Sequence, residues 1–143
     1  MTFPHTAKID TTALAGMKHL GSFISNLQLK SGAIPSNKDG SHDPWDHLEA
    51  VMGLATLGFN HEAMLGLEWM KDNQNEDGSW YNLYQGNEAI EKNKQSNFST
   101  YIAVAVWQNY LLTNDLSILE NFWSTVEKGM AFALSLQNTN GAI

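Results

Sequence analysis

The chain has 143 residues, a net charge of −7 and a pI near 5.0. This acidity excludes nucleic acid and anionic membrane surfaces as partners, because both need a basic face on the protein. The chain has no cysteine, which excludes disulfides and zinc–thiolate sites. We find no signal peptide and no run of about 20 apolar residues that could span a membrane. We therefore expect a cytoplasmic protein.

Apolar residues recur at three- and four-residue steps after Asp10 and predict a first helix that ends at Leu27. Glycine, proline and serine are frequent in residues 28–43, which predicts a loop. Asp43 followed by Pro44 is typical of a helix start, with the aspartate at the N-cap and the proline in the first turn. A second helix is expected from this point.

The second helix is expected to end at Gly58, in the left-handed conformation of a helix C-cap. Asn60 would cap a third helix, which forms an antiparallel hairpin with the second. Residues 73–97 are polar and irregular and predict the longest loop. A further helix is expected from about Ser99, and a short helix leads to a last one capped by Ser124. No segment alternates as a strand does, so the predicted fold class is all-α.

A phrase in which a glutamine is followed four residues later by a glycine ends three of the helical segments. The copies are Gln28 to Gly32, Gln74 to Gly78, and Gln137 to Gly141. The glutamine amide can bond carbonyls left free at a helix end, and the glycine permits a turn closed to other residues. Repetition of this kind predicts a helical repeat of stacked hairpins. We expect residues 1–143 to form one domain that is incomplete at its C-terminus.

Three resemblances follow from these motifs. Residues 74–80 resemble the glutamine–tryptophan repeat of squalene cyclases and protein prenyltransferases, which are α/α toroids. Residues 110–126 are similar to a conserved stretch of the six-hairpin (α/α)6 glycosidases. The order of residues 32–35, 42–50 and 74–80 resembles bacterial proteins labelled as prenyltransferases, over roughly residues 20–143. The resemblances imply antiparallel hairpins that form part of an (α/α)6 toroid.

The densest polar cluster lies at the start of the second helix. Paired carboxylates there could divide the work of general acid and general base if the pKa of one were raised. The candidate catalytic residues are Asp43, Asp46, His47 and Glu49. Aromatic side chains nearby could form a wall that stabilises a carbocation or stacks on a sugar. The candidate substrate-binding residues are His42, Trp45, Trp80 and Tyr84. Helix capping alone is the alternative explanation for the two aspartates.

Three functions remain open from the sequence. The first is a prenyltransferase-like or terpene-cyclase-like enzyme acting on an isoprenoid. If that substrate were a diphosphate, Mg²⁺ held by carboxylates would be the expected cofactor. Against it, the chain has no arginine, no Asp-x-Asp-Asp acid motif and no zinc-ligand cysteine. The second is a glycosidase-like enzyme that acts on a carbohydrate with paired carboxylates. The third is a non-catalytic α/α scaffold. A metal site from His42, Asp43, Asp46 and His47 is a weaker alternative, since the spacing matches no strong zinc motif.

Overall fold

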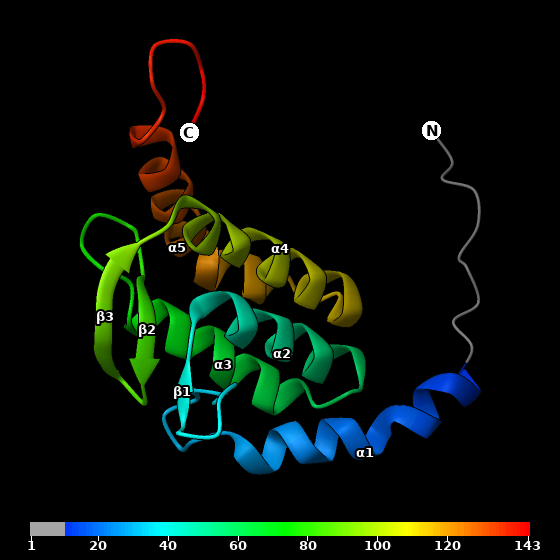
Figure 1. Ribbon diagram of the computed structural model, residues 1–143. Coiled ribbons are helices and arrows are strands. Elements are labelled where there is room, and N and C mark those ends of the chain that lie inside the picture. Colours follow the sequence, from blue (N-terminus) through cyan, green and yellow to red (C-terminus); the bar gives the residue numbers. More distant parts are fainter. Residues whose placement is uncertain (1–10) are drawn as a thin grey trace, which may run out of the picture.

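The computed structural model describes residues 11–143 and shows a mostly helical chain with one small sheet (Figure 1). The predicted cap at Asp10 lies outside the described residues. In chain order the elements are α1 (Thr11–Leu27), β1 (Ser41–His42), α2 (Pro44–Thr56), α3 (Asn60–Asp72), β2 (Tyr81–Gln85), β3 (Glu88–Lys94), α4 (Ser96–Thr113) and α5 (Leu116–Ser135). The prediction of an all-α chain is therefore corrected by three short strands.

The helices form two layers. Helices α2 and α4 run side by side in the same direction, and α1, α3 and α5 run back along them (Figure 1). The pairs α2–α3 and α4–α5 are antiparallel hairpins, as the repeat predicted. The core lies between α2, α3 and α4, where Trp69 and Trp80 are almost fully buried. Closure of these hairpins into a complete toroid stays a prediction.

The sheet occupies the segment that was predicted to be a long loop. Strands β2 and β3 pair antiparallel, and β1 pairs with the other edge of β2. Gly86, at a φ of +61°, turns the chain between β2 and β3. This hairpin lies beside the N-terminal ends of α2 and α4 (Figure 1). It therefore borders the polar cluster at the start of α2.

Helix ends agree with the sequence at some positions and differ at others. Asp43 caps α2, because its Oδ1 accepts a hydrogen bond of 2.9 Å from the backbone N–H of Asp46. Gly58 has a φ of +84°, as predicted. Asn60 is not a cap but the first residue of α3, and no side chain caps that helix. Two predicted starts are also wrong. Helix α4 begins at Ser96, and α5 runs unbroken through Ser124.

The glutamine of the repeated phrase joins the end of one helix to the next helix of the same layer. The side-chain amide of Gln28 donates to the carbonyl of its own phrase glycine and to the carbonyl of Glu62 in α3, at 3.0 and 2.9 Å. Gln74 repeats the pattern toward Thr125 in α5, also at 3.0 and 2.9 Å. Gln137 keeps only the bond to its own glycine within the described residues, at 2.7 Å.

The phrase glycines lie directly against the next helix. Gly32 and Gly78 have φ values of +93° and +88°, a region that other residues rarely adopt. A Cβ on Gly32 would overlap the carbonyl oxygen of Leu65, and one on Gly78 would overlap that of Lys128. Each glycine is therefore required both by its backbone angle and by the close approach of a helix. The sequence predicted the first requirement only.

The turn that contains the glycine occurs four times among residues 11–143. Its copies are residues 29–34, 37–42, 75–80 and 138–143. In each, the N–H of the first residue donates to the carbonyl of the fifth at 2.8 to 3.0 Å, and the glycine is the fourth residue. The copy at 37–42 was missed because no helix-ending glutamine precedes it. The turn at 37–42 ends in β1, which leads directly to the start of α2.

Candidate functional site

The start of α2 presents a pair of aspartates at the protein surface. Asp46 is exposed and Asp43 is partly exposed. The pKa of Asp46 is raised, first by its partial burial and then by the negative charge of Asp43, while a hydrogen bond with Ser36 opposes the shift. A carboxyl group with a raised pKa can hold a proton closer to neutral pH than an ordinary aspartate. The raised pKa of Asp46 is in the direction that a proton donor needs.

An aromatic pair lies on the same turn of α2. The indole of Trp45 stacks on the ring of Tyr101 from α4, with centroids 3.9 Å apart and planes 7° apart. One oxygen of Glu49 accepts from the Trp45 Nε1 at 2.8 Å and from the Tyr101 hydroxyl at 3.5 Å. The predicted residues Trp45 and Glu49 are thus brought together. Sequence analysis missed Tyr101, because no motif connects it to α2.

His47, predicted to be catalytic, makes two buried contacts with the backbone. Its Nδ1 accepts from the N–H of Ile34 at 3.2 Å, and its Nε2 lies 3.0 Å from the carbonyl of Gly66, to which it can donate. Burial lowers the pKa of His47 to about 3. Both ring nitrogens are occupied, so the side chain joins the first glycine turn to α2 and α3.

The other three predicted substrate-binding residues lie in the interior. Trp80 is fully buried and donates its indole N–H to the carbonyl of Met70 at 2.8 Å. Tyr84 is 2% exposed, and burial raises its pKa to about 12. His42 is fully buried against Trp69, and burial lowers its pKa to about 4. Neither ring nitrogen of His42 has a hydrogen-bond partner among residues 11–143. The expected aromatic wall is therefore divided between the surface and the core.

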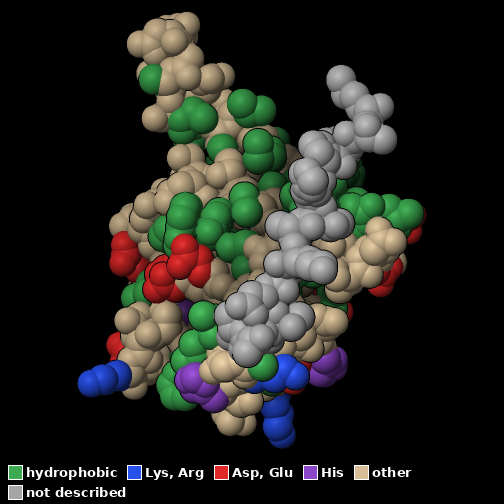
Figure 2. Space-filling model, turned by 90° about the vertical axis from the view of Figure 1, so that its right-hand side faces the viewer, with side chains coloured by type: hydrophobic (Ala, Val, Ile, Leu, Met, Phe, Trp, Pro, Cys, Tyr) green, Lys and Arg blue, Asp and Glu red, His purple; other side chains and the backbone are tan. Residues whose placement is uncertain are grey.

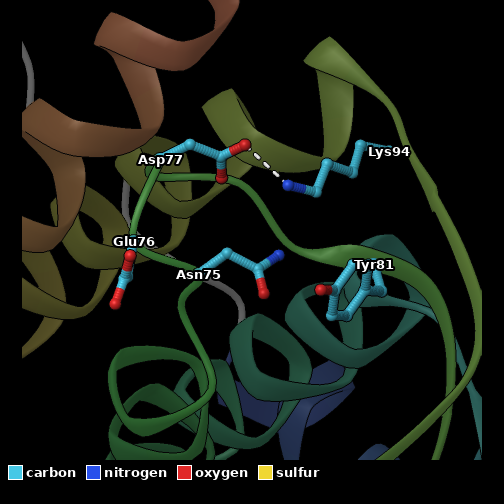
Figure 3. A pocket seen from close by; sticks show the side chains of 5 residues that line it. All are labelled: Asn75, Glu76, Asp77, Tyr81 and Lys94. Carbon is cyan, nitrogen blue, oxygen red and sulfur yellow. Dashed lines mark hydrogen bonds and ion pairs between the residues drawn. The ribbon is translucent and has the colours of Figure 1, made fainter.

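A polar hollow of about 370 Å³ lies beside the third of the four turns (Figure 3). It is lined by Asn75, Glu76, Asp77, Tyr81 and Lys94. Lys94 forms an ion pair of 2.6 Å with Asp77, and its ammonium lies 5.4 Å from the centroid of the Tyr81 ring. Partial burial opposes the ionisation of Asp77, but the bonds from Lys94 and Ser79 outweigh it and lower the pKa of this carboxyl. The ion pair leaves Asp77 unsuited to donate a proton.

The described part of the chain contains no group of three or more histidine, aspartate or glutamate side chains that could hold a metal ion. The four residues considered for a metal site do not converge, since both ring nitrogens of His47 contact the backbone and His42 is enclosed by aromatic rings.

A second hollow, of about 420 Å³, lies next to α1 and is lined in part by Phe23, Leu27 and Pro35. No helix in residues 11–143 is long and apolar enough to cross a bilayer.

No protein-family model matches the sequence. A curated protein from Mycolicibacterium hassiacum, named MMP endo-(1,4)-3-O-methyl-alpha-D-mannosidase, is 35% identical to this chain over 120 residues. The match covers 84% of this chain and 33% of that relative, so the chain spans about a third of the relative's length. The similarity favours the glycosidase-like alternative and gives no support to the prenyltransferase interpretation.

Proposed function

We propose that this chain belongs to a glycosidase-like enzyme that hydrolyses a carbohydrate, and that its hairpins form part of an α/α toroid. The observation that carries the proposal is the 35% identity to a protein named as an endo-mannosidase. The absence of arginine agrees with a neutral substrate, which needs no clamp for phosphate groups. The start of α2 supplies the chemistry.

Asp46 is the proposed proton donor. Glycoside hydrolysis commonly uses one carboxylic acid to protonate the leaving oxygen and a second carboxylate to activate water or to attack the sugar. Asp46 is exposed, and its raised pKa favours the protonated form that a general acid needs. Asp43 is the proposed partner carboxylate. Its negative charge raises the pKa of Asp46, and its Oδ1 accepts the hydrogen bond from the Asp46 N–H that caps α2.

The stacked rings of Trp45 and Tyr101 are proposed as the sugar-binding platform. Both rings are partly exposed, and their parallel planes are fixed through Glu49. A rigid aromatic surface binds the apolar face of a sugar ring with little loss of side-chain entropy. Glu49 is then a positioning residue, and His47 holds α2 against the first glycine turn.

The test is hydrolysis of α-1,4-linked mannose oligosaccharides by the full-length protein. The rate is measured from the reducing ends that hydrolysis releases. We expect Asp46→Asn to lower turnover by a factor of about 10² to 10⁴, the usual contribution of a general acid. Asp72→Asn is the matched control, because Asp72 is an exposed aspartate at the C-terminal end of α3 and is not one of the proposed site residues. Equal activity of Asp46→Asn and the wild type would remove the assignment of Asp46.

A binding experiment separates the two enzyme classes. The thermal unfolding of the full-length protein is measured with mannose oligosaccharides and, separately, with prenyl diphosphates plus Mg²⁺. A higher Tm with the oligosaccharides supports the proposal. A higher Tm with the prenyl diphosphates and none with the sugars would refute it.

A further inference from the structure

The hollow beside the third glycine turn is enclosed by side chains from two elements in the middle of the chain. Asn75 and Asp77 belong to the turn, while Tyr81 and Lys94 are directly paired residues of β2 and β3. Figure 3 shows the carboxylate of Asp77 and the ammonium of Lys94 together on one side of the hollow. The side chains of Asn75 and Tyr81 face each other on another side, so four different polar groups converge there.

The turn holds its two polar side chains in fixed positions. The backbone N–H of Asn75 donates to the carbonyl of Ser79 at 2.9 Å, which closes the turn. The Oδ1 of Asp77 accepts from both the backbone N–H and the hydroxyl of Ser79. Gly78 lies against the backbone of Lys128 in α5, so the whole turn is anchored. Groups fixed in this way lose little freedom when a ligand binds.

Each of the four groups keeps hydrogen-bonding capacity for a ligand. The amide of Asn75 donates from Nδ2 to the Ser79 hydroxyl at 3.0 Å, which leaves its Oδ1 as an acceptor. Lys94 uses one of three donors on Asp77, and the two side chains are 31% and 46% exposed. Tyr81 bonds to Tyr84 through its backbone N–H, and its hydroxyl has no partner among residues 11–143.

The charges of the hollow favour a neutral ligand. Its lining has one ammonium, on Lys94, against the two carboxylates of Glu76 and Asp77, so an anion would be repelled. The described part of the chain has no group of three side chains that could hold a metal ion. A ligand that both donates and accepts hydrogen bonds matches the lining best, and sugar hydroxyls do both. The volume of about 370 Å³ lies within the usual range of small-molecule sites.

The side of the molecule away from the sheet has a different character. Hydrophobic side chains gather on it (Figure 2), and α4, which ends on that side (Figure 1), exposes more than half of Trp107 and Leu111. The polar hollow lies instead beside the sheet, on the same side as the start of α2 (Figure 1). A hydroxyl-rich ligand is therefore expected on the sheet side.

The second glycine turn has the same internal bonds as the third. Asn37 donates to the hydroxyl of Ser41, and Asp39 Oδ1 accepts from the N–H and the hydroxyl of Ser41. The residue that follows the second turn is Asp43, and the residue that follows the third is Tyr81. The same rigid turn thus precedes a member of the proposed carboxylate pair in one copy and a member of the hollow in the other.

We propose that the hollow is a carbohydrate-binding subsite that holds one neutral sugar unit through its hydroxyl groups. The proposal rests on the proposed function, because the sugar is taken to be a unit of the oligosaccharide that Asp46 would cleave. Lys94 would donate to one hydroxyl, and Asp77 would accept from its neighbour. Tyr81 and Asn75 would bond hydroxyls on the opposite edge of the same ring.

The test is the binding of mannose oligosaccharides to the full-length protein with Asp46→Asn, which prevents cleavage, measured by titration calorimetry. Tyr81→Phe removes one free hydroxyl and should raise Kd about fivefold. Lys94→Met removes a charged donor and should raise Kd about 10- to 100-fold. Tyr110→Phe and Lys92→Met are the matched controls. They remove the same groups at the C-terminal end of α4 and on β3, outside the hollow, and should leave Kd unchanged.

Two further readouts separate a binding role from a structural one. In the protein with Asp46 intact, Tyr81→Phe should raise KM in the same proportion as Kd and leave kcat unchanged, because a sugar unit away from the reacting bond is bound equally in the ground and transition states. In NMR spectra, the oligosaccharide should shift the side-chain amide signals of Asn75.

The possible outcomes distinguish this proposal from the proposed function. Oligosaccharide binding that neither Tyr81→Phe nor Lys94→Met weakens would overturn the subsite, even where Asp46 acts as proposed. Weaker binding in both variants of a protein that hydrolyses no oligosaccharide would support the subsite and refute the hydrolysis. A full-length protein that binds no oligosaccharide would refute both.

Discussion

Substituting Gly78 with alanine tests the claim that the glycine turn presses against a helix backbone. Gly78 has a φ of +88°, and an added Cβ would overlap the carbonyl oxygen of Lys128 and lie 2.5 Å from its carbonyl carbon. Ordinary contacts of a Cβ begin near 3.4 Å. The neighbour is main chain within α5 and cannot rotate away, so the turn and the helix must separate by about an ångström.

Two costs add in this variant. Placing alanine in the left-handed region costs about 1–2 kcal/mol, and forcing apart a packed contact costs about 1–3 kcal/mol more. We expect the free energy of unfolding to fall by about 2–5 kcal/mol. Gly58 is the matched control: its φ is +84°, but nothing lies within 4 Å of its added Cβ. Gly58→Ala should therefore show only the first cost.

Urea denaturation followed by tryptophan fluorescence measures both variants against the wild type. The difference between Gly78→Ala and Gly58→Ala isolates the contact with α5, because the backbone strain is common to both. The m-values should stay equal, so that the change in midpoint reports stability alone. Equal losses in the two variants would show that the turn does not press on α5, and the account of the repeat would then be wrong.

Three further predictions concern the same framework. Burial lowers the pKa of His42 to about 4 and of His47 to about 3, so the folded state stays unprotonated while the unfolded state takes up protons below pH 6.5. The free energy of unfolding should therefore be highest above pH 6.5 and should fall by about 1.4 kcal/mol per pH unit per histidine between pH 6.5 and about pH 4. Urea titrations at pH 7, 6, 5 and 4 would measure this fall. Gln74→Ala should cost about 1–3 kcal/mol through two lost hydrogen bonds, and Gln137→Ala less, when both are compared by thermal melts at low concentration. Asp43→Ala should cost about 1 kcal/mol by removing the cap of α2, and amide exchange in the first turn of that helix should accelerate.

The sequence revealed the repeat because its determinants are local. A glutamine and a glycine four residues apart form a bond within one turn, so the phrase at Gln28 is visible without any tertiary contact. The cap at Asp43 is local for the same reason. The second bonds of Gln28 and Gln74 join residues 34 and 51 positions apart and could not be inferred from spacing. The pairing of Trp45 with Tyr101 is hidden for the same reason.

The β-hairpin was missed because its two strands differ in composition. Residues 81–85 contain aromatic and apolar side chains, but residues 88–94 carry four charges and no β-branched residue except Ile90. The Gly86-Asn87 pair between them is a recognised hairpin turn and was the signal that could have located it. Pairing with β2 and its position at the edge of the sheet, where charge is tolerated, decide the structure of the second strand.

The two hairpins can be aligned by contacts rather than by sequence. Gly66 of α3 lies against His47 of α2, and Gly129 of α5 lies against Ser99 of α4. His47 and Ser99 are each the fourth residue of their helix, so the N-cap of α2 corresponds to the N-cap of α4. The comparison shows which residues a hairpin start needs for packing and which are peculiar to one copy.

The carboxylates are peculiar to the first hairpin. Asp43 corresponds to Gln95, which caps α4 without a side-chain hydrogen bond, and Asp46 corresponds to Phe98. The fold therefore builds the same hairpin start without an acid at either position, and helix capping alone does not require the pair. Asp43→Gln with Asp46→Phe, which copies the start of α4 onto α2, should lose about 1 kcal/mol of stability with the cap and lose the proposed hydrolysis. A variant that unfolds instead, while Asp43→Ala remains folded, would show that the pair is needed by the structure.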